Sequence, residues 1–149
     1  MVILTTVLGS RRSEALPLLL TLSSGVSGFT TIHAGSARQA LTRLRFLAQL
    51  SDGARNLPVA ALNGLVSEAV DLVVHTERGP DGPRVGSILA VEDLTAGAEA
   101  VQFTTTEVFT RDRVDAPLRT TGLRPVRVIG RLGRAGVEVG DLLAGGPGA

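Results

Sequence analysis

Short runs rich in β-branched residues alternate along the chain with segments of helical periodicity. Residues 1–8, 29–33 and 71–75 are apolar runs of the length and composition that buried strands have. Residues 14–22 and 36–50 lie between these runs and carry apolar side chains at helical spacing. This alternation predicts an α/β fold, in which a parallel sheet is flanked by helices.

Residues 36–50 give the clearest predicted helix. Ser36 is placed to cap its first amides, and small or apolar residues repeat at helical spacing after it: Ala37, Ala40, Leu41, Leu44, Leu47 and Ala48. We expect this stripe to cover the sheet and Arg38 and Arg45 to remain largely exposed. The run 29–33 is predicted to be a central strand, with His33 at its carboxyl end beside the helix start and an open cleft.

The second half of the chain contains a helix, a turn and a hairpin by the same criteria. Pro58 suits a first helical turn, and apolar residues follow it at helical spacing. We predict a helix over 58–70, a turn at 79–83, a hairpin of strands 84–92 and 100–109, and a terminal amphipathic helix over 124–136.

The composition excludes several kinds of chemistry. The chain has 149 residues and a formal net charge of +1, and all fifteen basic residues are arginines. Without lysine there is no P-loop lysine, Schiff base or lysine general base, and without cysteine there is no disulfide or zinc–thiolate site. With four Phe and no Trp or Tyr, a base-stacking surface for nucleic acid is not expected. No apolar run reaches the roughly 20 residues of a transmembrane helix.

Residues 28–44 read GFTTIHAGSARQALTRL. This stretch resembles the histidine box of type II and type IV secretion ATPases, and most closely that of the tight-adherence (Flp) pilus branch. Those proteins carry a T-x-H-A-N-S-x-x-x-A-L-x-R-L pattern after a small-residue loop. Gly35 replaces the asparagine here, and the other positions hold.

Further similarities to this family follow in the same order along the chain. They span residues 14–142 and consist of 14–16 with 24–25 before the box, then Leu57-Pro58, 69–74, Arg84-Val85 and the TGLRP segment at 121–125. The resemblance implies a partial RecA-like P-loop NTPase domain over residues 1–122, with its P-loop half missing. A C-terminal helical segment and tail follow over 123–149.

The sequence departs from the family where ATP would be cleaved. The P-loop and an acidic box are absent, and the glutamate of the family's G-E-V-R-G motif falls on Gly9. Arg11 stands at the position of that motif's arginine. Because hydrolysis needs a phosphate cradle, a Mg²⁺ ligand and a group that orients water, we expect no ATPase activity from this chain alone.

The resemblance implies nucleotide-binding roles for His33, Thr31, Thr30 and Arg11, near the phosphates of ATP with its Mg²⁺. His33 would couple nucleotide state to movement between subunits. Each residue also has a plainer interpretation: His33 closes a strand end, the threonines are ordinary strand residues, and Arg11 lies in a solvated loop. We interpret His75 as structural. Glu92 and Asp93 would point to opposite faces of a strand, so they are not an acid–base pair.

The resemblance therefore predicts a truncated secretion or pilus-assembly ATPase. Its full-length relatives couple ATP hydrolysis to pilus assembly or protein export, as hexameric rings in the cytoplasm at inner-membrane platform proteins. An alternative is a non-catalytic interaction module that joins such a ring. A third is an exported protein, because Arg11-Arg12 followed by the apolar residues 16–20 resembles a twin-arginine signal, although Glu14 interrupts it.

Overall fold

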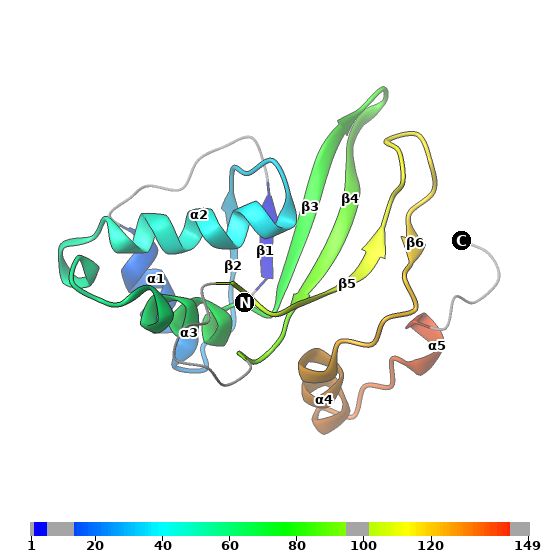
Figure 1. Cartoon of the computed structure of the whole chain (residues 1–149). Coiled ribbons are helices and arrows are strands. Elements are labelled where there is room, and N and C mark those ends of the chain that lie inside the picture. The colour runs from blue at the N-terminus through cyan, green and yellow to red at the C-terminus, as the bar shows by residue number, and fades with distance from the viewer. Residues whose placement is uncertain (1, 6–13, 95–101, 144–149) are drawn as a thin grey trace.

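The computed structural model describes residues 2–5, 14–94 and 102–143. They form a six-stranded mixed sheet in the order β2-β1-β3-β4-β5-β6 (Figure 1). The strands are β1 (Val2–Thr5), β2 (Phe29–Ile32), β3 (Leu72–Gly79), β4 (Gly82–Val91), β5 (Thr105–Thr110) and β6 (Arg119–Thr120). The predicted α/β class is confirmed.

The first three strands are parallel, and β1 lies between β2 and β3. Val2 of β1 pairs with Phe29 on one side and with Leu72 on the other. The parallel arrangement predicted for the sheet is thus confined to these three strands. The prediction that residues 29–33 form a central strand is wrong, because β1 rather than β2 occupies the inner position and β2 lies at the edge.

The remaining strands are antiparallel. Strand β3 runs past the predicted end at His75 to Gly79, and a tight turn leads into β4 at Gly82, whose φ of 130° favours glycine. The register of the pair shifts between His75 and Thr76. Strands β4 and β5 pair as the predicted hairpin, although β5 begins only at Thr105, and residues 100 and 101 lie outside the described ranges. The short β6 was not predicted.

In the part of the chain that the structure describes, α-helices and a short 3₁₀ helix accompany the sheet. They are α1 (Ala15–Ser23), α2 (Ala37–Gln49), the 3₁₀ helix η2 (Asp52–Ala54), α3 (Val59–Ala69), α4 (Val126–Arg134) and α5 (Gly140–Leu143). The Ser36 side chain accepts a hydrogen bond of 3.2 Å from the Gln39 amide, so the predicted cap of α2 is confirmed. None of the helices in the described ranges combines the length and apolar character that a membrane crossing requires.

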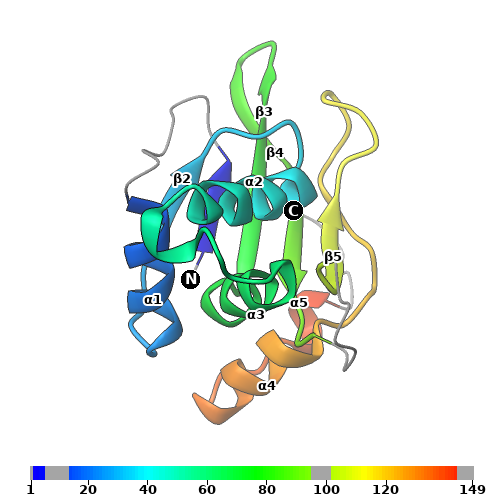
Figure 2. The same cartoon turned by 60° about the vertical axis from the view of Figure 1, so that its left-hand side comes forward.

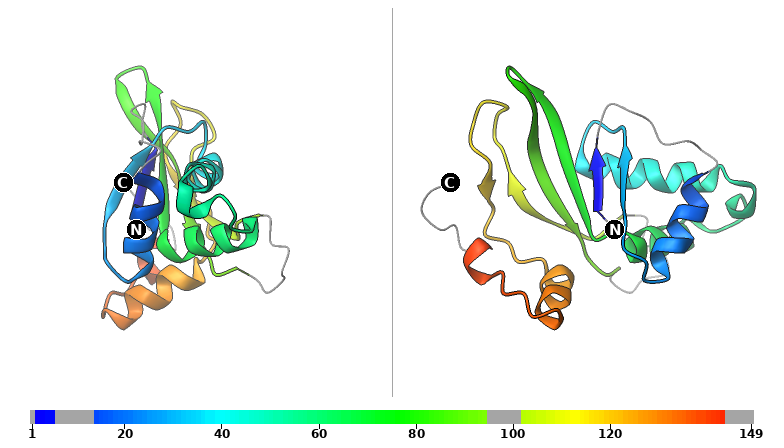
Figure 3. Two further views of the ribbon diagram at one scale, coloured as in Figure 1. Left: turned by 90° about the vertical axis from the view of Figure 1, so that its left-hand side faces the viewer. Right: turned by 180° about the vertical axis from the view of Figure 1, so that it is seen from behind.

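One hydrophobic core joins α1, α2 and α3 to one face of the sheet. Figures 2 and 3 show α2 and α3 on the same side of the strands, with α1 beside them near β2. Leu41 and Leu44 of α2 are 0% and 2% exposed, as predicted, and burial of each side chain stabilises the fold by roughly 1.5–3 kcal/mol. Arg38 is exposed, but Arg45 is half-buried, contrary to prediction. It donates a hydrogen bond to Asn63 and lies over the Phe103 ring.

The opposite face of the sheet carries apolar side chains from several strands. The register places Phe29 of β2, Leu72 and Val74 of β3, and Ile88 of β4 on this side. Phe29 is 78% exposed, and the other three are half-buried. Within the described ranges, the buried core formed by α1 to α3 lies on the other side of the strands. The molecule therefore presents an apolar sheet face that these helices do not cover.

Candidate functional site

His33 follows directly after β2, at the edge of the sheet where parallel strands end. It is exposed, and α2 begins four residues later at Ala37. Carboxyl ends of parallel strands are where ligands gather in open α/β sheets. The position predicted for His33, at a strand end next to a helix start, is therefore confirmed, whereas the open cleft expected beside it and its role stay predictions.

Of the other predicted nucleotide-binding residues, Thr31 lies two positions before His33 on β2 and is exposed like it, whereas Thr30 faces the other way. Along β2 the side chains alternate, so Thr30 is half-buried on the core side and Thr31 is exposed on the opposite face. Arg11 lies outside the described residues. Three hollows on the described surface are lined by other residues, at the outer face of α2, at the β3–β4 turn and around Phe103. The two threonines therefore cannot serve one ligand from the same face.

His75 is a buried histidine on the interior strand β3. It is 9% exposed on β3, and its Nε2 lies 3.7 Å from Oε1 of Glu77. Thr5 of β1 pairs with both His75 and Ile32, so His75 is level with the end of β2. The burial of His75 among strands fits its predicted structural role.

The residues present do not fit a complete site for ATP and Mg²⁺. The sequence has no lysine to reach the phosphates. Among the described residues, no three His, Asp or Glu side chains gather closely enough to hold a metal ion.

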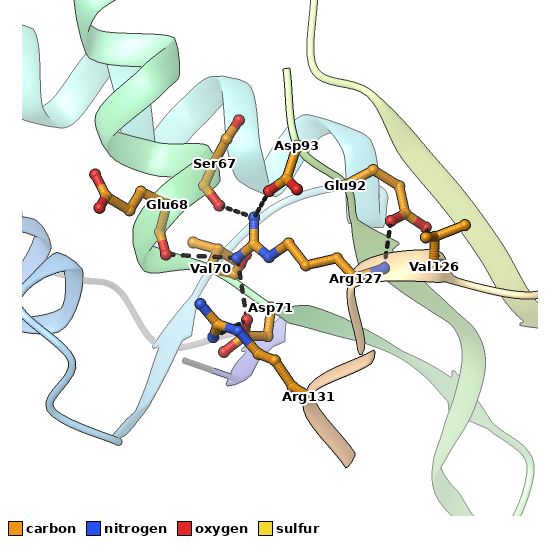
Figure 4. A network of polar contacts seen from close by, with 9 residues as sticks. All are labelled: Ser67, Glu68, Val70, Asp71, Glu92, Asp93, Val126, Arg127 and Arg131. Atoms are coloured by element: carbon orange, nitrogen blue, oxygen red, sulfur yellow. Dashed lines mark hydrogen bonds and ion pairs between the residues drawn. The ribbon is translucent and has the colours of Figure 1, made fainter. Parts of the chain in front are cut away.

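Sequence reasoning missed a polar cluster that joins α4 to the body of the domain (Figure 4). We call it the Arg127 cluster, and it comprises Asp71, Glu92, Arg127 and Arg131 with the main-chain oxygens around the end of α3. The guanidinium of Arg127 donates to the main-chain oxygen of Ser67, to that of Glu68 at 3.4 Å and to that of Val70 at 2.9 Å. These carbonyls lie where α3 ends, at the negative end of its dipole, so a cation there is favourable.

Asp71 receives two arginines at the start of β3. Its Oδ1 accepts from Arg127 at 3.0 Å and from Arg131 at 2.6 Å. The Arg127 side chain is only 8% exposed, whereas that of Arg131 is 50% exposed. Burial raises the pKa of Asp71, but positive groups around it, Arg127 and Arg131 among them, outweigh burial, and the pKa lies below its ordinary value.

Glu92 caps α4 from a distant part of the chain. Its carboxylate accepts from the amides of Val126 at 3.2 Å and Arg127 at 3.0 Å, and from the Thr106 hydroxyl at 2.8 Å. The local N-cap, Pro125, offers no side-chain bond. The prediction that Glu92 and Asp93 diverge on a strand is wrong, because β4 ends at Val91. Asp93 also faces the cluster, with its Oδ1 3.6 Å from Nη1 of Arg127.

The TGLRP segment, residues 121–125, leads directly into α4. Thr121 donates from its hydroxyl to the main-chain oxygen of Glu107 at 2.6 Å, which fixes the chain just before α4. The sequence signals of this cluster are the arginine-rich helix predicted over 124–136 and the acidic pair Glu92-Asp93. It could not reveal the partners at residues 67–71, because these lie up to 60 positions away.

Comparison with known proteins places these features in a wider context. No model of a known protein family matches the chain. It is 37% identical over 93 residues to the probable conjugal transfer protein TrbB of Sinorhizobium fredii (strain NBRC 101917 / NGR234), a match that covers 62% of this chain and 27% of that protein. It is 39% identical over 69 residues to the type IV secretion system protein PtlH of Bordetella pertussis, covering 46% of this chain and 20% of PtlH.

Among solved structures, the VirB11 ATPase from the Brucella suis type IV secretion system, in complex with sulphate, aligns with a TM-score of 0.49 and 26% identity. The alignment covers 58% of this chain and 26% of that one. The matched region thus amounts to between 20% and 27% of the length of these proteins. The sequence matches show that this chain is partially homologous to proteins of conjugal transfer and type IV secretion.

Proposed function

We propose that this chain is a relative of the secretion and pilus-assembly ATPases and comprises part of a RecA-like domain. The observation that carries the proposal is the 37% identity over 93 residues to a conjugal transfer protein. The histidine-box resemblance of residues 28–44 supports the assignment to the Flp pilus branch. The strand–His33–helix arrangement is compatible with that box.

The chain does not hydrolyse ATP by itself under this proposal. The absence of lysine and the Gly9 at the expected glutamate position remove the phosphate cradle and the acidic group. Its role is then to join a ring of full-length ATPase subunits, a hexamer in the family, in the cytoplasm beside inner-membrane platform proteins. Complete subunits would bind ATP and Mg²⁺, and the contribution of this chain would be limited to His33 near a phosphate.

A phosphate-release assay tests the catalytic part. The chain and a His33→Ala variant are incubated with ATP and Mg²⁺, and both are expected to match a buffer control. Release well above the control in the parent chain, and lost in the variant, would overturn the proposal of an inactive chain. The variant distinguishes activity of this chain from a contaminating ATPase.

Association is tested by mixing the chain with a full-length type IV secretion ATPase and measuring mass by light scattering after size exclusion. Co-elution with the ring is expected. Separate elution of the two proteins would refute the ring-joining role. The DNA upstream of Met1 provides an independent test, because a P-loop encoded there in another frame would identify a broken motor instead.

A further inference from the structure

The outward face of α2 forms a shallow groove. It has a volume of about 450 Å³. The residues that line it include Arg38, Thr42, Arg43, Arg45, Phe46 and Gln49. We call this surface the α2 groove. The buried stripe centred on Leu41 and Leu44 occupies the opposite side of the same helix, so the groove faces away from the core.

The charge of the α2 groove is of one sign. Helix α2 carries three arginines and no acidic residue, and no acid lines the groove. Within the described ranges, Arg38 and Arg43 form no ion pair. Solvated helix faces usually mix charges of both signs, so a uniformly basic face favours an acidic partner.

An aromatic side chain lies between these arginines. Phe46 is 57% exposed, and helical geometry places Arg38 and Arg45 on one side of it and Arg43 on the other. A second hollow of about 170 Å³, around Phe103, shares Arg38 and Thr42 with the groove. The surface therefore combines an exposed apolar centre with a basic rim, the arrangement of a protein interface.

We propose that the α2 groove binds an acidic, amphipathic helix of a partner protein. Arg38 and Arg43 lie on either side of Phe46 on the outward face of α2, so carboxylates on both flanks of an apolar stripe on a second helix can reach them. Guanidinium groups bind carboxylates through paired hydrogen bonds. Phe46 contacts an apolar residue of that helix, and Thr42 and Gln49 bond its polar side chains. A single exposed aromatic favours this partner over a nucleic-acid strand, which uses successive stacking surfaces.

The proposal is tested with the full chain and a fluorescein-labelled 21-residue helical peptide that carries Glu on both flanks of a Leu stripe. Binding is measured by fluorescence anisotropy at two salt concentrations, and its location by ¹⁵N amide shifts. The test variant is Arg38→Glu/Arg43→Glu. The control is Arg78→Glu/Arg134→Glu, which changes the net charge equally at exposed sites outside the groove.

Binding of the peptide is expected to shift α2 amides, to weaken with salt, and to fall by about tenfold or more in the test variant but not in the control. A Lys-for-Glu peptide should not bind. The proposal fails if the acidic peptide does not bind at millimolar concentration, or if both double variants weaken it equally. It also fails if a single-stranded oligonucleotide of equal charge binds the same amides more tightly.

Discussion

Replacing Arg127 by alanine is expected to release α4 from the domain. The side chain is 8% exposed and bonds to the Val70 oxygen at 2.9 Å and the Asp71 carboxylate at 3.0 Å. No apolar residue of α4 is buried, so hydrophobic packing contributes little to holding the helix. A helix of nine residues is not stable alone in water. Protection of its amides therefore reports how firmly the Arg127 cluster holds it.

The expected magnitude follows from burial. Removing one partner of a fully buried ion pair costs about 3–5 kcal/mol. Asp71 keeps Arg131 at 2.6 Å, and water can reach the freed carbonyls at the end of α3. We therefore expect a loss of about 2–3 kcal/mol for Arg127→Ala. Arg131 bonds to the same carboxylate but is 50% exposed, so Arg131→Ala should cost about 0–1 kcal/mol.

Hydrogen exchange of the α4 amides, followed by mass spectrometry, measures this difference. Exchange should accelerate by about 30- to 150-fold in Arg127→Ala, and by about fivefold or less in Arg131→Ala. Arg127→Lys should resemble alanine more than arginine, because an ammonium cannot span several carbonyls as a guanidinium does. Equal acceleration in the alanine variants of Arg127 and Arg131 would refute the assignment of the holding role to buried Arg127.

Three further predictions concern Asp71, α2 and its cap. The folded pKa of Asp71 lies below its unfolded value of about 3.9, so its contribution to stability is present above pH 4 and is lost as pH falls through the folded pKa. Urea unfolding should show Asp71→Asn less stable than the parent at pH 7, with the gap closing in acid; a gap constant with pH contradicts this. Leu41→Ala should lower the unfolding free energy by about 2–5 kcal/mol, whereas Arg43→Ala on the same helix should change it by less than about 0.5 kcal/mol. Ser36→Ala should lower the free energy of unfolding by about 1 kcal/mol in the same assay. An unchanged free energy would show that the Ser36 cap does not stabilise the helix.

Local patterns predicted the helices and the hairpin well. The stripe on α2 and the cap at Ser36 are short-range features, and the sequence contains all the information that they need. The Pro58 start of α3 is of the same kind. Strand order is not a short-range feature, because the sequence Phe29–Ile32 suits an edge strand and a central strand equally well. Only the pairing of β1 with β3 decides its place.

The candidate site was predicted in part for the same reason. The place of His33, at a strand end before a helix, follows from adjacent residues. Whether Thr30 and Thr31 join it depends on which face each occupies, and the alternation of β2 separates them. Arg127 finds its partners because the tertiary fold brings the end of α3 into contact with the start of α4. The periodicity of the sequence does not predict this long-range contact.

The Arg127 cluster also sets an order of assembly. The bonds from the Arg127 side chain to α3 and β3 join residues 56 to 60 positions apart, and the carbonyls of Ser67 and Val70 converge only after α3 has ended and β3 has begun. The Arg127 side chain can make these bonds only where the end of α3 and the start of β3 are already in place. Helix α4 should therefore dock after the α1–α3 core has formed, and detach before that core unfolds. During synthesis, the core can be complete while the last arginines are still being added to the chain.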